Sequence, residues 1–141
     1  MLTPDELDVL RTLRGPIVVV TGDDRIAHAS GEALALFGWD ESLIGRPLTA
    51  IIPQRLHQRH LDGFQRYVDT GVSRLQGGTV RVPALRRDST EVDVDLTIRV
   101  FQRPDGSRLA VAALSKAAVG KPPAALRIIE KAFIKRVYAL V

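Results

Sequence analysis

The residues best suited to chemistry in this chain are His57 and His60, three positions apart in the basic segment PQRLHQRHLDGFQRY. On a helix this spacing places the two imidazoles at neighbouring positions, where they could share a metal ion. The sequence supplies no evident third ligand. We therefore interpret the pair as part of an exposed basic helix face.

His60 taken alone leaves two interpretations open. If its helix faces an apolar cavity, a neutral imidazole nitrogen can bind the iron of a haem. Otherwise His60 is a partly buried helix residue, bonded to the backbone or to a carboxylate such as Asp62.

The remaining polar clusters do not indicate catalysis. Asp93 and Asp95 share one face of a strand-like segment, which could suggest acid/base work but is also the ordinary pattern of a solvated sheet face. Asp23 and Asp24 follow a glycine and are typical of a hairpin turn. The chain has no cysteine, which excludes disulfides and thiol chemistry. We expect a protein that is not an enzyme.

Length and composition predict one small globular domain with a terminal appendage. The chain has 141 residues, of which 45% are hydrophobic and only 5% aromatic, so aliphatic side chains must build the core. The acidic N-terminus does not resemble a signal peptide, and no run approaches the roughly 18 to 20 apolar residues that span a bilayer. We expect a cytoplasmic protein.

The net charge of +4 is concentrated at one end of the chain. Up to Ser115 there are 14 Lys and Arg against 15 Asp and Glu, whereas from Lys116 onward six basic residues face only Glu130. A nucleic-acid-binding domain would spread basic residues over its folded surface. Nucleic acid is therefore not an expected partner of the globular part.

Helix signals are clearest at the N-terminus. Thr3 and Glu6 form a capping box around Pro4, and leucines recur every three residues until Gly15-Pro16 ends the segment. Because a short amphipathic helix must bury its apolar face, we expect residues 1–14 to form a homodimer surface. The leucines of that surface are Leu7, Leu10 and Leu13.

The central region, residues 15–117, predicts an α+β domain with an antiparallel sheet and helices on one face. A hairpin comes first, then a short helix, then a longer helix that begins at Pro53, and finally three strands. The expected strands are Ile17–Val20, Arg25–Ser30, Thr79–Leu85, Glu91–Val100 and Arg108–Leu114, and the expected helices are Gly31–Phe37 and Pro53–Thr70.

Residues 118–141 are expected to be a separate unit. Gly120 to Pro123 interrupts any continuous helix, and residues 124–141 predict a basic amphipathic helix. Such a helix could lie on an acidic membrane surface, bind a partner, or dock on the domain's own sheet.

The element order and four sequence phrases resemble the PAS superfamily over about Gly15 to Leu114. The phrases are FGWDESLIGRPL, IIP, RRDST and EVDVDLTI. The resemblance implies a five-stranded antiparallel sheet that, with its flanking helices, encloses a small pocket. It also implies a module that senses a ligand, a cofactor or light, or pairs with another copy, and passes the change to an output domain.

A narrower resemblance, over Ile44 to Ile98, is to the haem-binding PAS domains of the oxygen-sensing histidine kinases that control nitrogen fixation. It implies haem b as the leading cofactor candidate, with His60 as the iron ligand and Arg66 near a propionate. Val80 stands where those domains carry the arginine that bonds to oxygen, which implies carbon monoxide, nitric oxide or redox sensing instead. The apolar positions implied for the distal pocket are Leu75, Leu96 and Ile98.

The predicted function is therefore a non-catalytic PAS sensory and dimerisation module. The predicted ligand site lies between the helix Pro53–Thr70 and the inner sheet face, which carries Val92, Val94, Leu96 and Ile98. Two alternatives remain: a ligand-free interaction module, and a regulator that acts through its basic C-terminal helix on membrane or nucleic acid.

Overall fold

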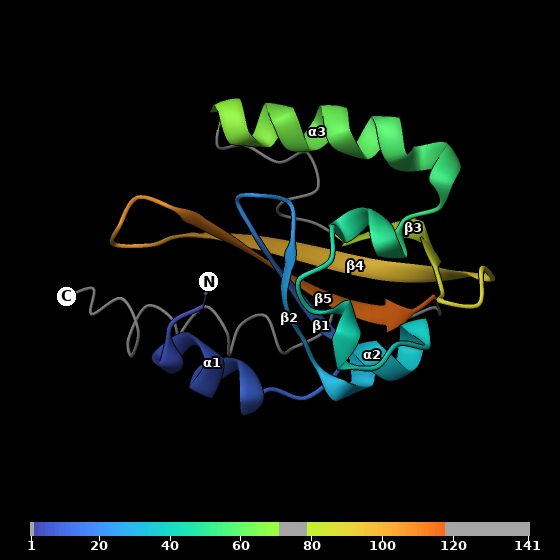
Figure 1. The fold of residues 1–141 in the computed structure, drawn as a ribbon, viewed down its shortest axis with the longest axis horizontal. Helices are drawn as coiled ribbons and strands as arrows, with labels where there is room; N and C mark the ends of the chain where they lie inside the picture. Colours follow the sequence, from blue (N-terminus) through green and yellow to red (C-terminus); the bar gives the residue numbers. More distant parts are fainter. Residues whose placement is uncertain (1, 71–78, 118–141) are drawn as a thin grey trace.

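Residues 2–70 and 79–117 are described by the computed structural model (Figure 1). They form one five-stranded antiparallel sheet with the strand order β2-β1-β5-β4-β3, so that β5 is the central strand. This confirms the predicted fold class. The strands are β1 Ile17–Thr21, β2 Ile26–Ala29, β3 Thr79–Leu85, β4 Glu91–Gln102 and β5 Arg108–Lys116.

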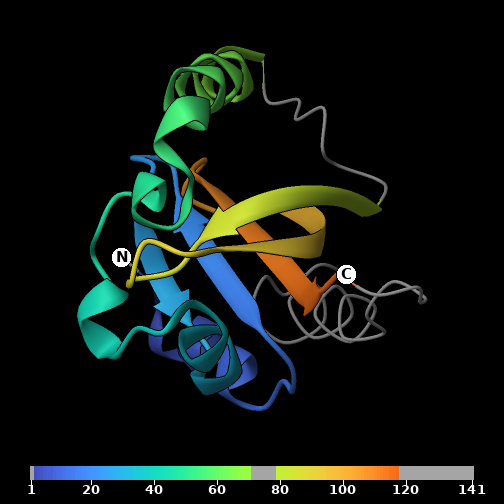
Figure 2. The same ribbon diagram turned by 90° about the vertical axis from the view of Figure 1, so that its right-hand side faces the viewer.

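The helices lie on both sides of this sheet. The α-helices are α1 Pro4–Arg11, α2 Gly31–Phe37 and α3 His57–Thr70, and the short 3-10 helices are η1 Glu41–Leu43, η2 Leu48–Ile51 and η3 Gln54–Leu56. Helix α3 stands apart from α1 and α2 in both ribbon views (Figures 1 and 2). No helix among residues 2–70 and 79–117 is long and apolar enough to cross a membrane.

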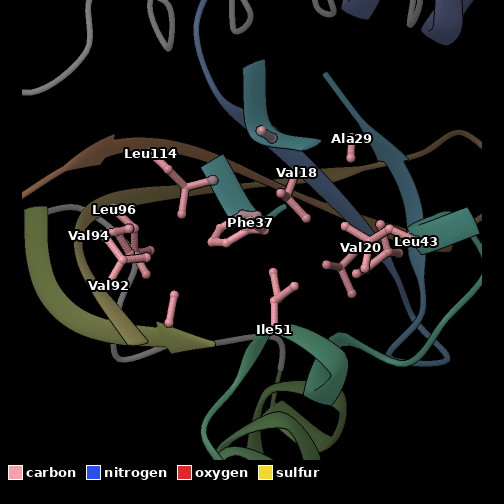
Figure 3. Packing of buried hydrophobic residues seen from close by; sticks show 13 residues of the cluster. Val18, Val20, Ala29, Phe37, Leu43, Ile51, Val92, Val94, Leu96 and Leu114 are labelled. Atoms are coloured by element: carbon pink, nitrogen blue, oxygen red, sulfur yellow. The ribbon is translucent and has the colours of Figure 1, made fainter. Parts of the chain in front are cut away.

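The alternation of β4 divides the core into an inner and an outer cluster. On the inner side, Phe37 of α2 and Ile51 of η2 pack against the sheet, and Figure 3 shows their side chains pointing toward one another. The sheet residues around them are Val18, Val20, Val92, Val94, Leu96 and Leu114. The segment that links the first hairpin to α3 therefore closes one end of the inner face.

Helix α1 covers the outer side of the sheet. Its N-cap is Thr3, whose side chain accepts a hydrogen bond from the Glu6 amide at 3.1 Å, while Glu6 accepts one from the Thr3 amide at 2.9 Å. Val9 and Leu10 are fully buried against the outer cluster, which includes Phe101, Leu109 and Val111. The predicted capping box is confirmed.

The packing of α1 changes the argument for a dimer surface. Leu10 is buried within its own chain, and Leu7 and Leu13 are partly buried against the same outer cluster. The apolar face of α1 therefore already has a partner, which is the sheet. The predicted C-terminal helix lies outside the described residues, as does the predicted unit 118–141 to which it belongs.

Candidate ligand site between helix α3 and the sheet

The inner face of the central strand is only half-buried. Ala110 and Ala112 of β5 pack against the inner cluster yet keep part of their surface exposed. On the other side of the same strand, Leu109 and Val111 are completely buried. Because α1 and the outer cluster close that side, solvent must reach the alanines from the inner face.

The neighbours of these alanines are partly exposed on β4 but buried on β1. Ala112 lies opposite Ile98 of β4 and Val18 of β1, and Ala110 lies opposite Val100 and Val20. Ile98 and Val80 also pack against the inner cluster while remaining half-buried. On this side of the sheet the central strand carries small side chains, flanked by larger ones on β1 and β4.

Helix α3 presents a row of rings on the side that meets the inner cluster. Phe64 packs against the inner cluster and is itself half-buried. Its ring centroid lies 6.0 Å from that of His60 and 5.7 Å from that of Tyr67, the latter pair meeting edge to face. We call the half-buried apolar set Phe64, Val80, Ile98, Ala110 and Ala112 the α3 site.

Polar contacts attach the two ends of α3 to two hairpins. Near its N-terminus, His60 bonds to Asp24 in the β1–β2 turn. Near its C-terminus, the Arg108 guanidinium of β5 lies 6.0 Å from the centroid of the buried Tyr67 ring. Burial raises the pKa of Tyr67, against the opposing effect of the Arg108 charge, so its phenol stays neutral at physiological pH.

The segment that leads into α3 has a third contact with the sheet. Arg55 of η3 forms a two-pronged ion pair with Glu91 at the start of β4, with one N–O distance of 2.8 Å. Both side chains are exposed, so this pair adds little stability but fixes where the helix begins.

The surroundings of His60 do not fit a haem iron. Its Nε2 lies 2.9 Å from each carboxylate oxygen of Asp24, and the two side chains are 18% and 15% exposed. A nitrogen that donates to a carboxylate has no lone pair for iron. Among the described residues, no group of three or more His, Cys, Asp or Glu could hold a metal ion.

The partner of His60 is therefore a carboxylate, although not the one suggested by sequence. Asp62 accepts a hydrogen bond from Gln58, whereas Asp24 reaches His60 from 36 positions away. Asp24 has a backbone φ of 62°, in the left-handed region that Asp tolerates better than most residues. The sequence predicted the turn at residues 21–25, but it could not predict that this turn lies next to α3.

The other predicted site residues divide into two groups. Val80 pairs with Leu96 across β3 and β4, and both lie with Ile98 in the inner cluster. Arg66 is exposed on α3, and Leu75 lies outside the described residues. Sequence reasoning missed Ala110 and Ala112, whose signal was the alternation of alanine with larger residues in β5.

Comparison with known proteins gives one family. A family model described as the PAS fold matches residues 8–114. A protein of Azorhizobium caulinodans is 35% identical over 103 residues, a region that is 72% of this chain but only 14% of that protein.

Solved structures are similar in fold. A light-oxygen-voltage domain has a TM-score of 0.60 at 18% sequence identity, covering 80% of this chain and 84% of its own. The PAS domain of an HTR-like protein from Haloarcula marismortui has a TM-score of 0.56 at 21% identity, covering 79% of this chain and 94% of its own.

Proposed function

Because this chain belongs to the PAS family, whose members are sensory and signalling modules, we propose that it senses a small apolar ligand bound in the α3 site. The observation that carries the proposal is the partial exposure of Ala110 and Ala112 on the inner face of the central strand. Apolar surface in the middle of a sheet is normally covered by side chains. A ligand between α3 and β5 would cover it.

The side chains around the α3 site favour a ligand that is uncharged where it contacts them. The inner cluster and the residues packed on it are apolar. A charge placed among them would lose its hydration without gaining a partner. Each Å² of apolar surface removed from water contributes about 25 cal/mol, so a flat or chain-like hydrocarbon skeleton is the ligand class that fits.

The proposal is tested with an uncharged fluorescent probe, N-phenyl-1-naphthylamine, titrated into the full chain. We expect saturable binding in wild type and at least about ten-fold weaker binding in Ala112→Phe, because the new ring occupies the site. Ala35→Phe is the matched control, since Ala35 is exposed on α2. Native mass spectrometry of the purified protein then searches for a co-purified natural ligand.

The same variant tests whether the space is open without any ligand. If the α3 site is open, Ala112→Phe has nearly wild-type stability in urea. If side chains already fill it, overpacking lowers the free energy of unfolding by about 1–3 kcal/mol. Equal probe binding by Ala112→Phe and wild type would contradict the proposed site.

Haem b, which the sequence resemblance implies, is not favoured by the surroundings of His60, although Val80, Leu96 and Ile98 lie together on the inner face. It requires the Nε2 of His60 to leave Asp24, and so is incompatible with the arrangement described above. An absorption spectrum after expression with haem precursor decides the question. A Soret band that is lost in His60→Ala but retained in His57→Ala would establish haem, and absence of the band would exclude it under those conditions.

We propose no enzymatic activity, in line with the generally sensory role of the family. The A. caulinodans relative is much longer than this chain, which spans about one seventh of its length. A PAS domain commonly dimerises or acts on an attached or separate output domain. We therefore propose that ligand occupancy is passed to such a partner, with homodimerisation as one form of it.

A further inference from the structure

Two arginine side chains from separate segments meet at the ring of one tryptophan, beside the C-terminal end of α2. We propose that Arg46 and Arg87, gathered around Trp39, form a binding site for an oxyanion, the carboxylate or phosphate group of a second molecule. This anion site shares no residue with the α3 site. The inference therefore does not depend on the proposed apolar ligand.

The two guanidiniums of the anion site are close together. The Cζ atom of Arg87 lies 4.6 Å from the centroid of the Trp39 ring, and the Cζ atom of Arg46 lies 4.8 Å from the same centroid. The negative face of an aromatic ring attracts each cation, whereas the two positive charges repel each other. An anion in contact with both guanidiniums would offset that repulsion.

Hydrogen bonds position the residues of this site before any anion binds. Phe37, the last residue of α2 and two positions before Trp39, accepts a hydrogen bond at its carbonyl from the Arg87 amide at 2.9 Å. The Nε of Arg46 donates to the Ser42 carbonyl at 3.1 Å. Because the site is held in place in advance, binding costs less conformational entropy.

The site also has hydrogen-bond donors to offer. Both arginine side chains are exposed, and the terminal nitrogens of Arg46 bond to no residue within 2–70 and 79–117. A guanidinium presents its N–H groups as a planar fork that matches a carboxylate or a phosphate. The buried Nε1 of Trp39 likewise has no acceptor in the described part of the chain, which is an unfavourable state for a buried donor. An oxyanion can accept from such donors.

Asp40 shows which kind of group this site accepts. One of its carboxylate oxygens lies 3.6 Å from a terminal nitrogen of Arg87, and the two side chains are 71% and 50% exposed. An exposed pair of this kind contributes little stability, so an external anion can replace Asp40. Hydrogen bonds from the Ser42 hydroxyl and amide lower the pKa of Asp40, which keeps this competing carboxylate charged near neutral pH.

The test uses the fluorescence of Trp39, which is the only tryptophan in the chain. Sodium phosphate and sodium acetate are titrated separately into the full chain, and sodium chloride at the same ionic strength controls for screening. We expect a saturable change with at least one of the two oxyanions, and the one that binds identifies the group. Isothermal titration calorimetry measures the same affinity without relying on the indole.

Variants of opposite expected effect test the assignment of the residues. Arg46→Gln and Arg87→Gln should each bind the oxyanion about ten-fold more weakly. Arg59→Gln is the matched control, because Arg59 is an exposed arginine on α3 and its loss changes the net charge equally. Asp40→Asn should bind about two- to five-fold more tightly, because it removes the competing charge and keeps an oxygen acceptor for the Ser42 amide.

Two results would overturn the anion site. One is an equal response to chloride and to both oxyanions at the same ionic strength. The other is an affinity that stays at the wild-type value in both Arg46→Gln and Arg87→Gln. Circular dichroism confirms that each variant is folded, and a gain of affinity in Asp40→Asn cannot arise from unfolding.

Discussion

Two carboxylates make ion pairs that join segments distant from one another in the sequence. Glu6 reaches Arg103 across 97 positions, and Asp24 reaches His60 across 36. Each is also set by a local motif, a capping box for Glu6 and a hairpin turn for Asp24. Local hydrogen bonds therefore position each carboxylate, and each then forms an ion pair with a side chain from a distant segment.

The contribution of the Asp24–His60 contact can be isolated with a double-mutant cycle of Asp24→Gly and His60→Ala. Glycine tolerates the left-handed backbone at this position, and the cycle cancels its effect on the unfolded chain. We expect a coupling energy of about 1–2 kcal/mol from urea unfolding. The matched cycle with His57→Ala should give a value near zero, because His57 bonds to the Ile52 carbonyl.

Acid should weaken the ion pair between Glu6 of α1 and Arg103. Burial alone would raise the pKa of Glu6, but hydrogen bonds from Arg103 and Thr3, together with the Arg103 charge, hold it below its usual value of 4.5. A carboxyl group whose pKa is lower in the folded than in the unfolded state stabilises the fold fully when the pH is above its unfolded pKa. This stabilisation is lost as the pH falls through its folded pKa. The stability advantage of wild type over Glu6→Gln should thus be largest near pH 7, at about 3 kcal/mol, and shrink below pH 4.5.

Chemical unfolding at pH 7 and at pH 3 measures this difference. Asp5→Asn provides the control, because Asp5 is an exposed neighbour on the same helix. A difference between wild type and Glu6→Gln that stays constant across this range would show that the ionised form of Glu6 is not what stabilises α1.

At the scale of elements, sequence periodicity located the regular structure well. The predicted spans Gly31–Phe37 and Thr79–Leu85 match α2 and β3, and the predicted β4 and β5 differ only at their C-terminal ends. Turn residues and strict alternation fix such segments locally. Periodicity could not identify the residues against which an apolar face packs, because this packing depends on contacts between segments that are distant in sequence.

Helix α1 shows this limit most clearly. Its leucine spacing correctly predicted an amphipathic helix, but the same spacing serves a dimer surface and an intramolecular contact equally well. The same limit applies to the site. Alternation placed Leu96 and Ile98 on one face, whereas the Asp24–His60 contact and the partial exposure of Ala110 and Ala112 depend on how the elements pack.

Leu10→Ala distinguishes the two roles of α1. Because Leu10 is fully buried against the outer cluster, its truncation should lower the free energy of unfolding by about 2–5 kcal/mol. Sedimentation of the variant should show an unchanged oligomeric state wherever it remains folded. A dissociated but fully stable variant would instead return α1 to the dimer surface predicted from sequence.

At the scale of the whole molecule, the two faces of the sheet are closed to different extents. The outer cluster has Leu109 and Val111 completely buried beneath α1, whereas the inner face has half-buried alanines on the same strand. Helix α3 is attached mainly at its ends, by His60 and Tyr67, with Phe64 between them. Both clusters contribute buried apolar side chains, and the partly exposed alanines on the inner side are the surface that the proposed ligand would cover.

This division predicts how a ligand should change the stability of the whole domain. A ligand that binds only the folded state at 100 times its Kd adds about 2.7 kcal/mol, which for a domain of this size raises Tm by about 10 °C. Thermal unfolding with saturating N-phenyl-1-naphthylamine should show that rise in wild type and in Ala35→Phe, but not in Ala112→Phe. An equal rise in all three would place the probe elsewhere on the molecule, because only Ala112 among the substituted positions lies in the α3 site.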